Sequence, residues 1–182
     1  MLRHLSESGD IRGMIWRLIA VFGLVLATAA GRAGPAVADD PPFLAFGVGV
    51  FDILDDETAA DFRVEYRHDQ KLWIFKPWAG IEATSDGAVY GVGGILVDVF
   101  LGRRLVITPS FGVGAYADGG GKDLGSVLEF RTQGEITYRF DNGMRLGGAV
   151  SHISNASTAD DNPGQNFVSA IFVVPLGTVF PD

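Results

Sequence analysis

Polar and apolar side chains alternate along residues 126–140, and this alternation constrains the fold more than any other feature of the chain. Successive side chains of a β-strand point to opposite sides, so such a strand has one polar and one apolar face. The polar face carries Glu129, Arg131, Gln133, Glu135, Thr137 and Arg139, and the other face carries Leu128, Phe130, Ile136, Tyr138 and Phe140. Residues 59–67 repeat the pattern, with Arg63, Glu65 and Arg67 opposite Phe62, Val64 and Tyr66.

Turn-forming clusters divide the chain from Phe43 onward into eight segments rich in β-branched and aromatic residues. We predict strands at about 43–53, 59–67, 71–84, 88–101, 104–117, 126–140, 144–155 and 166–177. The connections alternate in character. His68-Asp69-Gln70, Gly102-Arg103 and Asp141-Asn142-Gly143 form tight turns, whereas the others are polar loops that contain Asp55-Asp56-Glu57, Asp86, Gly119-Gly120-Gly121 or Asp160-Asp161. Short turns at one end and longer loops at the other are typical of outer-membrane barrels.

A soluble sandwich or lipocalin would show the same alternation, with its charged face toward water. The mixed signs of charge within single strands, the aromatic residues and the even strand number favour a membrane barrel instead. A charge on the lipid face at mid-membrane costs roughly 2–4 kcal/mol, so the charges belong inside. We therefore predict an all-β fold, an eight-stranded antiparallel outer-membrane β-barrel. Glu129, Arg131 and Glu135 should line its lumen, and Phe130, Ile136 and Tyr138 should face outward.

Residues 1–38 have the pattern of a cleaved signal peptide, which leaves residues 39–182 as one β-barrel domain. Met14, Trp16 and Arg17 precede an apolar run from Leu18 to Ala30, and Ala36-Val37-Ala38 provides an A-x-A cleavage site. The run is shorter than the ~20 residues of a spanning helix. An exported barrel of this kind belongs in the outer membrane of a Gram-negative bacterium. The chain contains no cysteine, so no disulfide framework supports it.

The charge of the chain argues against nucleic acid as a partner. The leader contains four of the 14 basic and two of the 22 acidic residues, leaving 10 basic against 20 acidic in the mature domain. The sequence indicates no cofactor and no metal site. It leaves open whether the barrel forms a homodimer.

Residues 144–155 carry two reactive side chains on an otherwise apolar face. His152 and Ser154 share that face with Met144, Leu146 and Val150, whereas Arg145 lies on the other. Because the Arg145 face is the lumen by the argument from charge, His152 and Ser154 should point outward at the upper end of the strand. Side chains at i and i+2 are neighbours on one face, so His152 can accept the proton of the Ser154 hydroxyl. An interfacial histidine without catalytic function is the competing interpretation.

The segment His152-Ile-Ser154-Asn155-Ala156, followed by Asn162-Pro-Gly164, resembles the signature of the PagL-type lipid A 3-O-deacylase family. The resemblance extends to the eight-strand layout of the whole mature chain. It implies a serine esterase that removes an ester-linked acyl chain from the lipid A of lipopolysaccharide, with a His, Ser and Glu triad on the outside of the barrel. His152 would be the base and Ser154 the nucleophile, and Asn155, Asn162 and Gly164 would build or support the oxyanion site.

The chain departs from the family pattern at the third member of the triad. The pattern has Glu at the opening of the last strand, where this chain has Gln165-Asn166. An amide at Asn166 can accept a hydrogen bond from the imidazole, but it cannot stabilise the imidazolium as a carboxylate would. Asp160 and Asp161, in the preceding loop, are alternative partners for His152. A catalytically inactive barrel with a structural or adhesin role is the alternative function.

Overall fold

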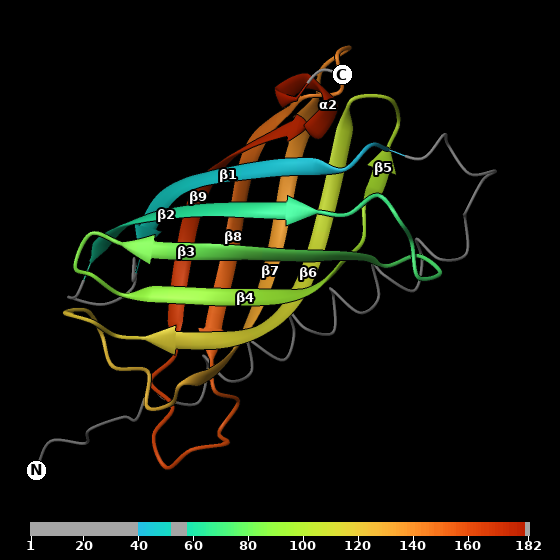
Figure 1. Cartoon of the computed structure of the whole chain (residues 1–182). Coiled ribbons are helices and arrows are strands. Elements are labelled where there is room, and N and C mark those ends of the chain that lie inside the picture. The colour runs from blue at the N-terminus through green and yellow to red at the C-terminus, as the bar shows by residue number, and fades with distance from the viewer. Residues whose placement is uncertain (1–39, 52–57, 181–182) are drawn as a thin grey trace, which may run out of the picture. The chain divides into compact units, whose positions relative to one another are not determined.

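The computed structural model describes residues 40–51 and 58–180, and the predicted signal peptide and Asp55-Asp56-Glu57 lie outside these residues. The strands are β1 (Phe43–Phe51), β2 (Ala59–Arg67), β3 (Lys76–Thr84), β4 (Val89–Leu96), β5 (Val99–Leu101), β6 (Leu105–Ala117), β7 (Leu128–Arg139), β8 (Arg145–Ser154) and β9 (Gln165–Pro175). A short helix, α2 (Leu176–Val179), follows β9 (Figure 1). No helix in the described part of the chain is long and apolar enough to span a bilayer.

The described strands close into an eight-stranded antiparallel barrel, as the alternation predicted. Strands that follow one another along the chain pair, except β4 and β5; β1 also pairs with β9, and β4 with β6, which closes the ring. β5 continues the path of β4 along β6, so the two share one position in the barrel. We call the end that carries the connections after β1, β3, β6 and β8 the loop end, and the opposite end the turn end.

The break between β4 and β5 lies opposite a proline in β6. Both strands pair with β6 in one continuous register, and the Val97 amide still donates to the Pro109 carbonyl at 3.0 Å. Pro109 has no N–H to return to the ladder, so the pairing is interrupted there. The predicted strand 88–101 therefore follows the observed path of the chain, but it is divided into two strands at residues 97–98.

The connection between β2 and β3 is longer than the tight turn predicted at His68-Asp69-Gln70. Leu72 and Phe75 pair with each other through two backbone hydrogen bonds of 2.7 and 3.2 Å, and Trp73 between them has a φ of 65°. This local hairpin satisfies its own backbone groups, so β3 begins at Lys76 and not at 71. The apolar residues of this hairpin have the composition of a strand, which explains why the strand was predicted to begin at residue 71.

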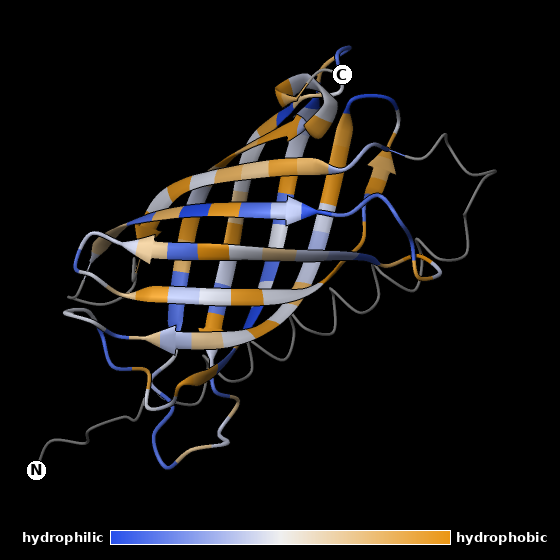
Figure 2. Ribbon diagram, in the orientation of Figure 1, coloured by the Kyte–Doolittle hydropathy of each residue, from blue (hydrophilic) through white to orange (hydrophobic). Residues whose placement is uncertain are grey.

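The two faces of the barrel wall are oriented as predicted. Glu129, Arg131 and Glu135 point into the lumen and are at most 2% exposed, whereas Ile136 and Tyr138 are 51% and 47% exposed on the outer wall. Phe130 is half-buried on the outer wall, where it stacks on Phe111 at 6.2 Å between ring centroids. Figure 2 shows the resulting alternation of hydrophilic and hydrophobic residues along the strands.

The middle of the lumen is filled by a network of ion pairs. The Arg131 guanidinium lies 4.4 Å from the Trp78 ring centroid, bonds Glu82 at 2.8 Å and pairs with Glu65. Arg67 joins Glu65 at 2.9 Å to Glu135 at 2.7 Å. These side chains are almost fully buried, so each charge depends on its partners to offset the loss of hydration.

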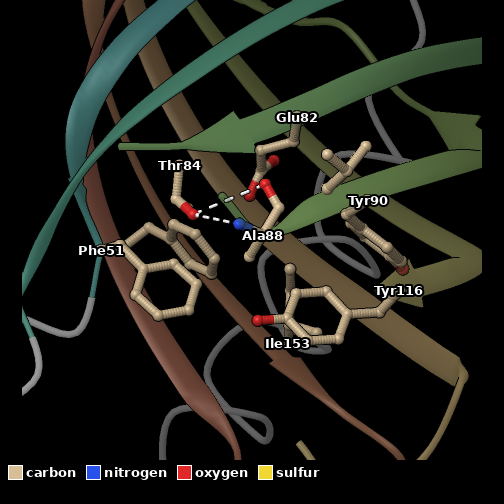
Figure 3. Close-up of a pocket in the computed structure, with 9 residues that line it drawn as sticks. Phe51, Glu82, Thr84, Ala88, Tyr90, Tyr116 and Ile153 are labelled. Carbon is tan, nitrogen blue, oxygen red and sulfur yellow. Dashed lines mark hydrogen bonds between the residues drawn. The ribbon is translucent and has the colours of Figure 1, made fainter. Parts of the chain in front are cut away.

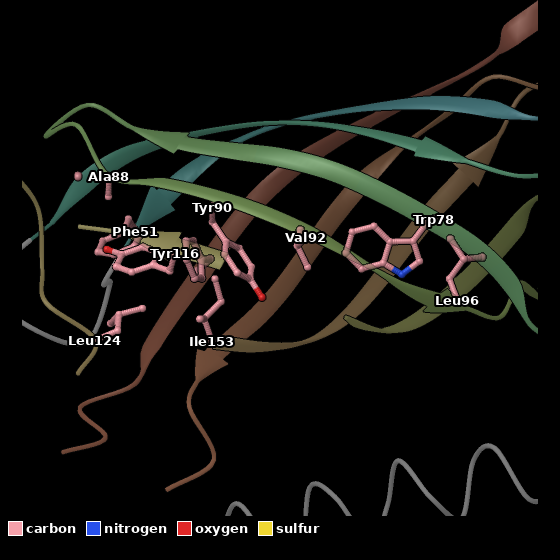
Figure 4. Close-up of a cluster of buried hydrophobic side chains, with 11 residues drawn as sticks. Phe51, Trp78, Ala88, Tyr90, Val92, Leu96, Tyr116, Leu124 and Ile153 are labelled. Atoms are coloured by element: carbon pink, nitrogen blue, oxygen red, sulfur yellow. The ribbon is translucent and has the colours of Figure 1, made fainter. Parts of the chain in front are cut away.

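Toward the loop end, apolar side chains gather in the lumen, although the carboxylates of Asp61 and Glu129 are also buried there. Phe51, Tyr116, Leu124 and Ile153 belong to one buried cluster, in which the Leu124 side chain comes from the loop after β6 (Figure 4). Phe51 also packs edge-on against Phe167 at 5.0 Å. In the described part of the chain, apolar side chains therefore fill this end of the lumen.

Candidate active site

His152 and Ser154 lie on the outer wall at the loop end of β8. His152 is exposed and Ser154 is half-buried. Two residues along a strand span about 7 Å, which makes the two side chains neighbours on one face. The outer wall on the turn-end side of His152 is apolar, with Val150 and Val168 exposed from β8 and β9. The two polar groups therefore mark the upper edge of an apolar surface.

The imidazole of His152 is bound to the side chain of Asn166. The two residues are direct cross-strand partners in β8 and β9, and Nδ1 of the ring lies 3.0 Å from Oδ1 of the amide. Since an amide oxygen only accepts, Nδ1 carries the proton and Nε2 is left as the basic nitrogen. The ring is thus held in the tautomer that a general base requires. In the described structure, no hydrogen bond joins His152 to Asp160 or Asp161. The backbone carbonyl of Asp161 instead accepts a hydrogen bond from the Asn155 side chain.

Gly164 lies directly beside the imidazole. A Cβ atom at this position would stand 3.1 Å from Cε1 and 3.5 Å from Nε2 of His152. Gly164 also has a φ of 65°, in the left-handed region that favours glycine. Two independent constraints, backbone conformation and space for the ring, therefore require glycine here.

The Gly164→Ala variant is expected to lower the rate of the ester cleavage that the sequence predicts roughly 10- to 100-fold, because the added methyl group displaces the imidazole by a few tenths of an ångström or more. The left-handed backbone should also reduce stability by about 1–2 kcal/mol. Gly143→Ala is the matched control, since Gly143 has a φ of 82° and a Cβ there would approach Pro175 at 3.3 Å, at the turn end. Turnover and urea unfolding should be measured on both variants. Equal turnover in the two would contradict the assigned position of the ring.

The Asn155 side chain is buried in the turn after β8 and does not face the outer wall. Its Nδ2 donates to the carbonyls of Leu124 at 3.1 Å and Asp161 at 2.7 Å, and its Oδ1 accepts from the Ser157 amide at 2.9 Å. Both N–H groups of the amide are therefore used within the fold. Of the two parts that the resemblance left open to Asn155, building or supporting the oxyanion site, this geometry leaves the supporting one.

Asn162 is the exposed member of the same turn. Its Oδ1 accepts the backbone amide of Asn155 at 3.1 Å, which orients the side chain, and its Nδ2 makes a long contact of 3.4 Å to the Ser157 hydroxyl. At least one N–H of Asn162 is left to point at a ligand. Ala156 and Ser157, with φ of 54° and 61°, give the turn its tight course.

Sequence reasoning missed the contribution of the loop between β6 and β7. Leu124 is 1% exposed and touches the turn after β8 through its carbonyl, although the loop was expected to be a polar connection. The available signal was a single leucine within the glycine-rich polar segment 119–126. Gln165, which opens the last strand, separates Gly164 from Asn166 and points inward, fully buried.

A small cavity lies on the other side of the wall, inside the lumen. Phe51, Glu82, Tyr90, Tyr116 and Ile153 are among its lining residues (Figure 3). Ile153 separates this cavity from the outer wall, because its neighbours His152 and Ser154 point the opposite way. The cavity therefore plays no part in the site. Among residues 40–51 and 58–180, no three His, Cys, Asp or Glu side chains gather in a way that could hold a metal ion.

Comparison with known proteins gives a match to one family model and to solved barrels. The family model is described as "Lipid A 3-O-deacylase (PagL)" and matches residues 57–175. The "Crystal structure of the outer membrane enzyme PagL" is similar, with a TM-score of 0.60 and 21% identity over 73% of this chain and 99% of that one. A structure from "De novo design of transmembrane beta-barrels" has a TM-score of 0.51 and 15% identity over 74% and 98%. No curated protein sequence matches.

Proposed function

Because the chain belongs to the lipid A 3-O-deacylase (PagL) family, we propose that it is an outer-membrane serine esterase that removes an ester-linked acyl chain from the lipid A of lipopolysaccharide. The observation that carries this proposal is the bond of 3.0 Å between His152 and Asn166 on the outer wall, with Ser154 on the same face. The ester bonds of lipid A lie in the outer leaflet, and both termini of such a barrel lie in the periplasm, so the loop end reaches this leaflet.

In the proposed reaction, Ser154 is the nucleophile and His152 the base. Oγ of Ser154 attacks the ester carbonyl carbon while Nε2 of His152 takes the hydroxyl proton. The bond from the carbonyl carbon to the sugar oxygen then breaks, and that oxygen takes the proton from His152. Water attacks the acyl-serine ester, gives its proton to Nε2, and the fatty acid leaves as Oγ regains a proton.

Asn166, Asn162 and Gly164 serve this chemistry without exchanging protons. Asn166 keeps Nδ1 of His152 protonated and so leaves Nε2 basic. Asn162 offers an N–H to the oxygen that becomes negative in the tetrahedral intermediate, where a single such donor contributes roughly 10²- to 10³-fold to the rate. Gly164 leaves room for the ring.

The direct test is mass spectrometry of lipid A from cells with and without the protein, followed by purified protein acting on purified lipopolysaccharide. Loss of one ester-linked acyl chain from the lipid, with release of the free acid, is the expected result. The site of the loss on the sugar identifies the acyl position. The presence of Asn166 where the family has Glu favours the second candidate, an inactive structural or adhesin barrel, and unchanged lipid A in both experiments would support that candidate instead.

Replacing Asn166 by glutamate is predicted to increase activity, which is unusual for a substitution in an active site. Asn166→Glu is expected to raise turnover at least about tenfold, because a carboxylate stabilises the imidazolium that forms as Ser154 attacks. The acidic limb of the pH–rate profile should move to higher pH, since the carboxylate also favours the protonated ring of the resting enzyme. Asn166→Ala should slow the reaction while lipopolysaccharide binding persists. Wild-type turnover in Asn166→Ala, with the barrel folded, would show that Asn166 does not orient the base.

A further inference from the structure

We propose that Leu124 and Gly125, in the loop between β6 and β7, are positioning residues of the esterase site. They hold the turn of residues 155–164 from its inner side and so fix Asn162 and Gly164 beside His152. This inference rests on the proposed function and extends the site to a second loop.

The loop is anchored to the barrel by its own contacts. The Leu124 side chain is 1% exposed within the apolar cluster that closes the loop end of the lumen, close to Tyr116 and Ile153 (Figure 4). The Tyr116 hydroxyl donates to the Lys122 carbonyl at 2.8 Å, and the Gly125 amide donates to Asp123 Oδ1 at 2.8 Å. The backbone at residues 124–125 is therefore fixed relative to the wall.

Two contacts join this backbone to the turn after β8. The Asn155 side-chain amide bridges the two segments, since its Nδ2 donates to the Leu124 carbonyl at 3.1 Å and to the Asp161 carbonyl at 2.7 Å. Gly125 approaches the same Asp161 carbonyl so closely that a Cβ atom would stand 2.6 Å from it. Gly125 has a φ of 80°, so the chain passes this point in a conformation that glycine favours.

The turn transmits this placement to the reacting groups. The Asn155 backbone amide, which follows Ser154, donates to Oδ1 of Asn162 at 3.1 Å. Asn162 and Gly164 are one and three residues beyond Asp161, and Gly164 sits against the His152 ring. A shift of the Asp161 carbonyl must therefore move the oxyanion donor and the glycine beside the base together.

The test compares two glycines of one loop. Gly125→Ala pushes the loop against Asp161, whereas Gly119→Ala is the matched control. Gly119 also has a positive φ, of 58°, and a Cβ there would stand 2.1 Å from the Gly87 carbonyl, in the turn between β3 and β4. We expect Gly125→Ala to lower kcat roughly 10- to 100-fold with KM little changed, because misplacement of about 1 Å at a reacting group has effects of this size. Gly119→Ala should retain wild-type kcat.

Hydrogen exchange gives a readout that does not depend on turnover. Backbone amides of residues 155–164 should exchange faster in Gly125→Ala than in Gly119→Ala, while the strands remain protected in both. Heat-modifiable mobility on gels confirms that each barrel is folded. Equal kcat in Gly125→Ala and wild type, or equal losses in the two variants, would overturn the positioning assignment.

The Leu124 anchor can be tested separately. Leu124→Ala should release the loop and lower kcat. Leu124→Met keeps most of the buried volume and should have a kcat close to that of the wild type. Wild-type protein that cleaves no ester and whose Ser154 does not react with a fluorophosphonate probe would refute the proposed function itself. An active wild type whose kcat is insensitive to both Leu124→Ala and Gly125→Ala would refute only the role of the loop.

Discussion

Ser154→Ala is expected to abolish deacylation, lowering turnover by roughly 10⁴-fold or more, because no other group of the site can form the acyl intermediate. His152→Ala should have an effect of similar size, since Oγ of Ser154 then has no base to take its proton. The two residues act in one proton transfer, so the double variant should lose little more than either single one. Release of free fatty acid from purified lipopolysaccharide is the appropriate measurement.

The same strand offers a matched control for this prediction. Ser151 also lies in β8, but its side chain points into the lumen, where it is 6% exposed. Ser151→Ala removes the same hydroxyl group from the opposite face and should leave deacylation unchanged. Wild-type turnover in Ser154→Ala, or a comparable loss in Ser151→Ala, would show that the outward face of β8 does not carry the reaction.

The largest expected effect on stability comes from Arg131→Met, which should reduce the free energy of unfolding by about 3–5 kcal/mol. The substitution removes the Arg131 bond of 2.8 Å to Glu82 and the pairing with Glu65, while methionine can still pack on Trp78. Glu65 keeps Arg67 at 2.9 Å, but Glu82 retains only a distant contact of 3.8 Å to Arg63. An almost unpaired charge is thus left in the lumen. Urea unfolding in lipid vesicles measures the loss.

Arg104→Met is the control for the loss of an arginine. Arg104 bonds Asp141 at 2.8 Å at the turn end, where both side chains are exposed, and this hydrogen bond together with the positive charge holds the pKa of Asp141 below its usual value. Water can replace most of this pairing, so stability should change by at most about 1 kcal/mol. Adding Glu82→Gln to Arg131→Met should recover part of the lost stability. Equal stability of Arg131→Met and wild type would mean that the lumen network is not a source of stability.

The barrel itself could be predicted because the physical constraint is simple and repeated. A wall with charges such as Glu129 and Arg131 on one face and Ile136 and Tyr138 on the other permits few arrangements, and each strand supplies the same information again. Strand pairing with a period of two then places His152 and Ser154 outward once Arg145 is placed inward. This reasoning needs no contact between distant parts of the chain.

The strand bounds and loop contacts that were not predicted depend on contacts between distant residues or on the local backbone conformation. The interruption at residues 97–98 is caused by Pro109 in the neighbouring strand. The hairpin at Leu72 and Phe75 satisfies the backbone hydrogen-bonding groups of a segment whose composition indicates a strand. The choice among Asn166, Asp160 and Asp161 as partner of His152 remained open in the sequence, because loop conformation decides it. The isolated leucine at position 124 hints at burial, but the sequence does not identify the partner of its carbonyl, which lies 31 positions away.

The placement of His152 on the outer wall has a consequence for how the rate should be measured. A group on this wall meets only molecules that diffuse within the same leaflet, so the relevant substrate concentration is the number of lipopolysaccharide molecules per unit of membrane area. Diluting lipopolysaccharide with other lipids in vesicles should therefore slow the reaction even when its bulk concentration is constant. Conversely, adding more vesicles of the same composition should leave the rate per enzyme molecule unchanged.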